Sequence, residues 1–121
     1  MNTNDQRLGL NGLMILGASL LLSACASAPQ PMYQWEGYQH QVYLYMKGES
    51  SAQQQITEME GDLQKIRAHG KTPPPGYYAH LGLLYANVGN TAMVVQDFQA
   101  EERLFPESAP YMDYLLSQNK K

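Results

Sequence analysis

Residues 78–106 read YAHLGLLYANVGNTAMVVQDFQAEERLFP, and this stretch decides the fold. Tyr78, Leu81 and Tyr85 recur at the spacing that places side chains on one face of a helix. The Gly89-Asn90 pair is a strong turn signal, and a second apolar stripe begins just after it. Because two helices joined by a short turn pack against each other, the stretch predicts a helical hairpin.

The order of residues in this stretch resembles the tetratricopeptide (TPR) repeat, in which an aromatic residue, Leu-Gly, Tyr, an Ala-x3-Phe pair and a closing Pro follow at fixed intervals. The resemblance implies that Gly82 lets the second helix approach closely, that Phe98 fills the space between the helices, and that Pro106 ends the second one. Thr91 is expected to cap the second helix. The expected packing positions are Tyr78, Leu81, Gly82, Tyr85, Phe98 and Pro106. Three positions depart from the repeat, which usually has Trp, Ala and a small residue there: Tyr78, Val94 and Glu101.

Two further helices are expected before this hairpin. Residues 35–46 carry Tyr38, Val42 and Tyr45 at helical spacing, and a longer helix follows. Its apolar residues form one stripe, made of Ala52, Ile56, Met59, Leu63 and Ile66. Ser50 or Ser51 is expected to cap this helix, and Gly70 to end it. Off the stripe lie charged residues that we expect to form a solvated face: Glu58, Glu60, Asp62, Lys65 and Arg67. This first pair lacks the Leu-Gly of the repeat, so we expect a degenerate hairpin.

A last helix is expected over residues 108–116, with Ser108 as its cap. The residues expected on its inner side are Tyr111, Met112, Leu115 and Leu116. The sequence therefore predicts an all-α fold over residues 33–121, with about two TPR-like antiparallel hairpins and a C-terminal capping helix. Because repeat arrays usually need about three units for stability, we expect this domain to depend on a homodimer or on a partner.

The beginning of the chain has a different character. Residues 8–22 form an apolar run that is too short for a membrane-spanning helix, which needs about 20 residues, but suits the core of a secretory signal peptide. The following Leu22-Ser23-Ala24-Cys25 resembles the lipobox of bacterial lipoproteins, and Cys25 is the only cysteine. The resemblance implies cleavage between Ala24 and Cys25 and a covalent lipid on Cys25. The alternatives are an ordinary signal peptide or a buried core cysteine.

The lipobox divides the chain into a signal peptide at residues 1–24, a lipidated cysteine with a flexible tether at residues 25–32, and the helical domain. In the lipoproteins that this motif resembles, Asp after the cysteine marks retention in the inner membrane. Ala26 stands there instead, which favours the periplasmic face of the outer membrane. The residues from Ala26 to Met32, at about 3.3 Å each, allow a reach of about 23 Å from the bilayer.

Charge and motifs argue against several functions. The net charge is −3 and no basic patch exists, so nucleic acid is not an expected partner. His40, His69 and His80 do not have the spacing of metal ligands, and no nucleophile or phosphate-binding motif is present. We therefore expect no enzyme activity, no metal, and no cofactor other than the lipid on Cys25.

The concave face of a TPR pair is built from its first helix and binds peptides, which gives a candidate partner groove. The inward positions of this helix are small, apolar or amide residues: Gly76, Ala79, Leu83, Ala86 and Asn87, with His80 at the edge. They lack the lysines that hold an acidic carboxy terminus, so an apolar helix or strand suits them better. The alternative is that this face only packs on the first hairpin.

A longer resemblance covers about Tyr33 to Leu116. The lipobox, the aromatic residues around Trp35 and the block PPPGYYAHLGLLYANVGN followed by LFPES are similar to a family of small proteobacterial outer-membrane lipoproteins of unknown function. Members are typically encoded beside a CsgG-like lipoprotein, which implies a shared envelope assembly. The expected function is a lipid-anchored, non-enzymatic adaptor that docks a CsgG-like or other envelope protein. The alternative is a regulator of a peptidoglycan synthase or hydrolase.

Overall fold

The computed structural model describes residues 28–119, and its helices all belong to the unit Met32–Lys121. The signal peptide, the cleavage site at Ala24 and the lipid site at Cys25 lie outside the described residues. Residues 28–32 are exposed and belong to no helix or strand. Within the described range, no helix is long and apolar enough to cross a membrane.

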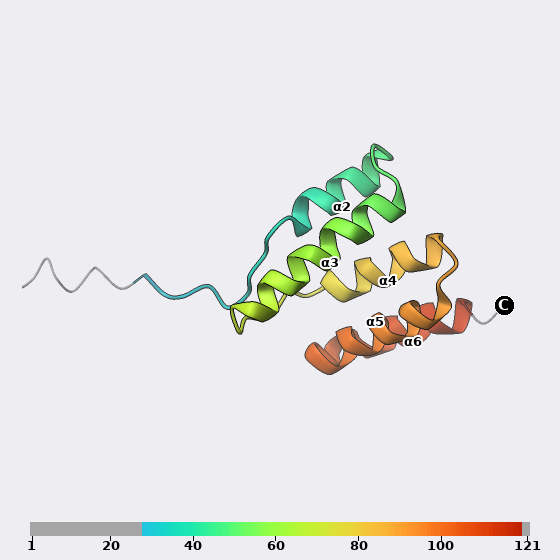
Figure 1. Cartoon of the computed structure of the whole chain (residues 1–121). Helices are drawn as coiled ribbons and strands as arrows, with labels where there is room; N and C mark the ends of the chain where they lie inside the picture. The colour runs from blue at the N-terminus through green and yellow to red at the C-terminus, as the bar shows by residue number, and fades with distance from the viewer. Residues whose placement is uncertain (1–27, 120–121) are drawn as a thin grey trace, which may run out of the picture. The chain divides into compact units, whose positions relative to one another are not determined.

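Five α-helices follow one another and lie side by side in chain order (Figure 1). They are α2 (Tyr38–Lys47), α3 (Ala52–Ala68), α4 (Tyr77–Asn87), α5 (Thr91–Leu104) and α6 (Ala109–Gln118), with a short 3-10 helix η2 (Pro106–Ser108) before α6. The part of the chain that the structure describes contains no strand. The predicted all-α fold, with helical hairpins and a C-terminal helix, is confirmed.

Helix α3 forms where its apolar stripe and its end signals agree. Ser51 is the N-cap, and it forms a capping box with Gln54 that satisfies backbone N–H groups at the start of the helix. The helix ends at His69, followed by Gly70 with φ of 63°. The stripe residues Ile56, Met59, Leu63 and Ile66 are all buried.

The hairpin of α4 and α5 is built around a close contact between Gly82 and Phe98. A Cβ atom added at Gly82 would lie 2.5 Å from Phe98 Cε1, so only glycine leaves room for the ring. The N-cap of α5 is Asn90, whose Oδ1 accepts from Met93 N at 3.3 Å. The expected cap at Thr91 was wrong by one residue, because Thr91 already lies within the helix.

The end of α5 and the start of α6 follow from Pro106. Helix α5 ends at Leu104, and Pro106 opens the 3-10 turn that leads into α6. Met112 is buried, with Leu115 and Leu116 half-buried against the same side. Tyr111 was expected on this inner side but is 58% exposed, and the Ser108 side chain makes no capping hydrogen bond.

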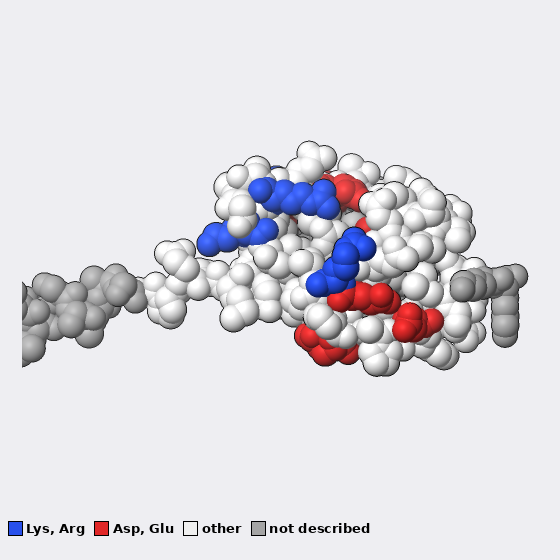
Figure 2. Space-filling view, turned by 90° about the horizontal axis from the view of Figure 1, so that it is seen from below, with Lys and Arg blue, Asp and Glu red and all other residues white. Residues whose placement is uncertain are grey.

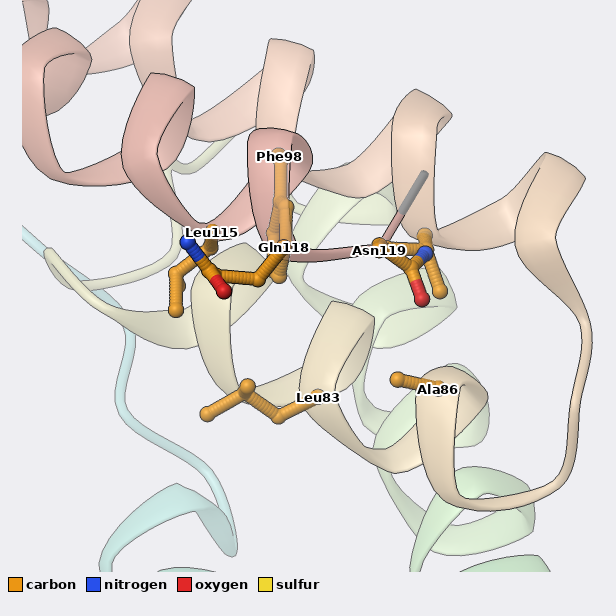
Figure 3. A pocket seen from close by; sticks show the side chains of 7 residues that line it. Leu83, Ala86, Phe98, Leu115, Gln118 and Asn119 are labelled. Atoms are coloured by element: carbon orange, nitrogen blue, oxygen red, sulfur yellow. The ribbon is translucent and has the colours of Figure 1, made fainter. Parts of the chain in front are cut away.

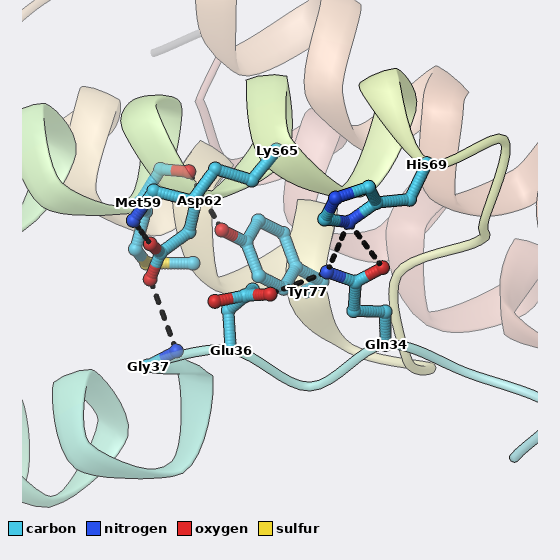
Figure 4. A network of polar contacts seen from close by, with 8 residues as sticks. All are labelled: Gln34, Glu36, Gly37, Met59, Asp62, Lys65, His69 and Tyr77. Carbon is cyan, nitrogen blue, oxygen red and sulfur yellow. Dashed lines mark hydrogen bonds and ion pairs between the residues drawn. The ribbon is translucent and has the colours of Figure 1, made fainter.

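The segment before α2 is bound to the rest of the helical unit by polar contacts (Figure 4). Gln34 N donates to Thr72 O at 3.0 Å, and Gly37 N donates to the Asp62 carboxylate at 3.0 Å. Asp62 also pairs with Lys65 at 2.8 Å. These contacts explain why α2 begins at Tyr38, later than the expected Trp35: residues before it are held by α3 and the following loop.

Helix α4 is the central element, and it has apolar residues all round, as a helix enclosed by others must. One side joins the first core, whose buried residues are Ile56, Met59, Leu63, Ile66, Tyr77, Tyr78, Leu81 and Leu84. The other side packs against the second core, whose buried residues are Val94, Phe98 and Met112. The side of α4 that packs on the second core is therefore the side on which a groove beside α6 can form.

Candidate partner-binding groove

An apolar groove lies between α4, α5 and the end of α6 (Figure 3). Its volume is about 220 Å³, and its lining residues are Leu83, Ala86, Val94, Phe98, Leu115, Gln118 and Asn119. Figure 3 shows Leu83 and Ala86 of α4 across from the residues of α6, with the amides of Gln118 and Asn119 at the rim. This volume is below the usual range of small-molecule pockets, about 300–1,000 Å³, and suits apolar side chains of a protein partner.

The structure divides the residues that sequence reasoning assigned to the groove. Leu83 and Ala86 line it, and Ala79 packs beside them against the second core. Asn87 is exposed at the end of α4 but is not among the lining residues. The groove faces α6, whereas the alternative interpretation had this side of α4 covered by the first hairpin.

His80 lies inside the protein, not at the edge of the groove. It is only 7% exposed and packs edge-on against two rings of α2, with centroid distances of 5.1 Å to Tyr45 and 6.2 Å to Tyr38. Its Nε2 has no hydrogen-bond partner among the described residues, and burial lowers the pKa of this imidazole. His80 is therefore a neutral packing residue between α2 and α4.

Gly76 is the N-cap of α4, and it is held by a carboxylate from α5. Glu101, which is 2% exposed, accepts from Gly76 N at 2.6 Å and from Ala79 N at 3.3 Å. Burial raises the pKa of Glu101, and the backbone N–H groups oppose that rise. Glu101 stands where the repeat usually has a small residue, and here its carboxylate satisfies free N–H groups at the start of the neighbouring helix.

The expected solvated face of α3 is also wrong in part. Glu60 accepts from the Tyr85 hydroxyl at 3.0 Å, Asp62 accepts from the backbone before α2, and Arg67 donates to the Tyr78 hydroxyl at 3.0 Å. Burial and the hydrogen bond to Glu60 together raise the pKa of Tyr85 to about 12. These side chains form polar contacts at the border of the first core, and the contacts link α3 to α4 and to the segment before α2.

Asp97 on α5 is a buried acid that sequence reasoning missed. It is 2% exposed, and its Oδ2 has no hydrogen-bond partner within the described part of the chain. Burial, with a smaller contribution from Glu60, raises the pKa of Asp97 to about 7, although Arg67 opposes the rise. No feature of the local sequence marks Asp97, because its burial depends on how distant segments pack around α5.

The described residues offer no constellation for chemistry at the groove. No group of three or more His, Cys, Asp or Glu within residues 28–119 could hold a metal ion. The groove has two amides at its rim and otherwise apolar walls, so it can exclude water from an apolar side chain and hydrogen-bond the backbone beside it. The geometry of the groove suits binding of an apolar segment, and its specificity would come from the shape of the walls and from the two amides at the rim.

The described part of the chain, residues 28–119, is thus a small all-α unit of helical hairpins with an apolar groove formed by α4, α5 and α6. More particularly, the chain belongs to the family described as Domain of unknown function (DUF4810), whose model matches residues 32–115. The match covers the segment before α2 and α6 as far as Leu115, so it includes the apolar walls of the groove but not Gln118 and Asn119 at its rim. No curated protein and no solved structure matches the chain.

Proposed function

We propose that this protein is a lipid-anchored, non-enzymatic interaction module on the periplasmic face of the outer membrane. Its groove takes an apolar segment of an envelope protein that is anchored to the same membrane. The observation that carries the proposal is the groove itself, with Leu83 and Ala86 on one wall and Leu115 on the other. A concave apolar surface between helices that is open to water is typical of a binding site.

The rim of the groove supports a peptide segment as the ligand. Gln118 and Asn119 each offer an amide that both donates and accepts, which suits the backbone of a bound helix end or strand. No charged side chain lines the groove, so an acidic or basic tail gains nothing there. Figure 2 shows Lys, Arg, Asp and Glu side chains gathered in clusters on one face, with uncharged surface beside them.

The lipid on Cys25 is the second part of the proposal. A single acyl chain holds a protein to a membrane only marginally, whereas the several acyl chains of a fully modified lipoprotein cysteine anchor it stably. Confinement to one membrane raises the effective concentration of a partner anchored beside it. A groove of modest size can therefore be occupied in the cell. The longer family resemblance supports a CsgG-like lipoprotein as that partner.

Replacing the sole cysteine tests the anchor. We expect Cys25→Ala to accumulate as an unprocessed precursor that is absent from the outer-membrane fraction, because neither lipid transfer nor cleavage can occur without the thiol. Metabolic labelling with palmitate, followed by membrane fractionation, measures both steps.

Ser27→Ala is the matched control, since it lies two residues beyond the cysteine and outside the motif. It should be processed and labelled like the natural chain. Normal cleavage and outer-membrane fractionation of Cys25→Ala would contradict the lipoprotein proposal.

A further inference from the structure

Several large apolar side chains are exposed on α2 and on the segment that leads into it. The exposed fractions are 80% for Met46, 77% for Met32, 53% for Tyr43 and 44% for Trp35. Tyr43 and Met46 are three residues apart and share the side of α2 opposite its buried residue, Gln41. Single exposed apolar residues are ordinary, but several on one short element mark an interaction surface.

The charges of α2 indicate what this surface contacts. The helix contains no Asp or Glu, and its one formal charge is Lys47 at its last position. The Lys47 ammonium lies 5.9 Å from the centre of the Tyr43 ring. This composition, in which Tyr, Trp and Met lie near a lysine that can extend outward, is typical of helices that lie at the boundary between lipid headgroups and acyl chains.

The place of this surface in the chain points to the same occupant. If Cys25 carries a lipid, as proposed above, Met32 lies within about 23 Å of the bilayer because only a short tether separates them. The residues that follow are fixed to the helical unit through Tyr33, whose ring lies 5.8 Å from that of Phe105, and through Gln34 and Gly37, and α2 is the next helix along the chain. A surface held so close needs only weak intrinsic affinity to be occupied.

We propose that the outer face of α2, with Met32 and Trp35, is a lipid-facing surface that lies in the interfacial layer of the bilayer. It rests on the proposed lipid anchor and adds a second, reversible contact with the same membrane. In Figure 1, α2 lies at one edge of the helix stack, and α5 and α6 lie at the other. Docking through α2 therefore turns the groove away from the lipid and toward partners.

Trp35 is the only tryptophan in the chain, so it reports directly on this surface. The chain from Cys25 onward, which contains the whole helical unit, is coupled through its sole thiol to a maleimide lipid in vesicles of phosphatidylethanolamine with a minority of phosphatidylglycerol. We expect Trp35 emission to shift to shorter wavelength and to be quenched by brominated acyl chains. The chemical anchor makes the result independent of whether cells lipidate Cys25, which the Cys25→Ala experiment tests separately.

A double variant, Tyr43→Ser with Met46→Ser, should lower the ratio of membrane-docked to undocked helical unit about tenfold, because it removes two of the four exposed apolar side chains of this surface. Both residues are exposed, so helical content measured by circular dichroism should not change. The matched control is Tyr111→Ser with Tyr114→Ser on α6, which removes two exposed rings of similar size and should leave quenching unchanged.

Two results would overturn the proposal. The first is that brominated lipid fails to quench Trp35 emission in the anchored natural chain, or that the α2 and α6 double variants change this quenching equally. The other is a blue shift that depends on protein concentration in the absence of vesicles, with the thiol blocked, since that would assign the surface to a second copy of this chain.

Discussion

Gly82→Leu is expected to unfold the hairpin of α4 and α5. The first atom of the new side chain would already lie 2.5 Å from Phe98 Cε1 and 2.6 Å from Phe98 Cδ1, and three more carbons follow it. Phe98 is buried in the second core and cannot move aside without opening it. We expect a loss of about 3 kcal/mol or more in the free energy of unfolding, measured by thermal and urea denaturation followed by circular dichroism.

Gly61 provides the matched control, because it is also a glycine within a helix, and an added Cβ there meets nothing within 4 Å. Gly61→Ala should raise stability by up to about 1 kcal/mol through helix propensity alone. Gly82→Ala should lower it despite the same gain in propensity. An unchanged thermal midpoint for Gly82→Leu would show that α4 and α5 do not meet at Gly82.

Asp97→Asn is expected to stabilise the protein above neutral pH by on the order of 2–4 kcal/mol. The folded state holds the proton of Asp97 up to pH about 7, whereas an unfolded chain releases it at its ordinary value of 3.8. Folding therefore takes up a proton between these values, and stability falls as pH rises through that window. Above it, the natural protein keeps a charged carboxylate in a buried place, and asparagine removes that cost.

The measurement is the thermal midpoint of the natural protein and of Asp97→Asn across the range from about pH 4 to pH 8. The two midpoints should nearly coincide at the acid end and separate as pH rises. Asp113→Asn, at an exposed position on α6, should follow the natural protein throughout. A constant difference between Asp97→Asn and the natural protein at every pH would contradict the buried charge.

Local signals in the sequence predicted the helices well, since each depends on neighbours a few residues away. The stripe from Ala52 to Ile66 predicted α3, and Pro106 predicted the end of α5. The close approach at Gly82 could be predicted because the Leu-Gly pattern and Phe98 are both in one continuous stretch. Small shifts of position, such as the cap at Asn90 instead of Thr91, arise where two adjacent residues can both cap a helix.

Contacts between distant segments could not be predicted in the same way. Glu101 looked like a poor residue for a helix contact, yet it lies beside Gly76 and satisfies the start of α4. His80 looked like a groove-edge residue, but α2 covers it. A single sequence gives no information about which helix covers which side of α4, so the partners of these two buried side chains could not be predicted.

The groove was predicted on one wall only. Leu83 and Ala86 were expected there from their positions on α4, but the opposite wall depends on α6. Leu115 was expected to pack inward, whereas Gln118 and Asn119 lie beyond the helix that was predicted over residues 108–116. Their position at the rim depends on how α6 packs on the hairpin, which no local pattern encodes.

The two proposed surfaces lie at opposite edges of the helical unit and have different proposed functions. The exposed face of α2 is proposed to contact lipid, and the groove formed by α4, α5 and α6 is proposed to hold the partner. The buried aromatic and polar contacts between them, such as Tyr77 Oη donating to Met59 O at 2.6 Å, keep the two edges in a fixed relation. A rigid unit of this kind can present its groove in one orientation.

Crosslinking in intact cells from a photoreactive residue at Leu83 tests the central proposal most directly. We expect it to capture an outer-membrane lipoprotein, CsgG-like or another, identified by mass spectrometry. The same probe at Val88, exposed just beyond α4 and outside the lining of the groove, should not capture it. Ala86→Phe, which fills the groove, should abolish the crosslink. Capture of only a second copy of this chain, of an inner-membrane synthase, or of nothing would contradict an outer-membrane adaptor that works through this groove.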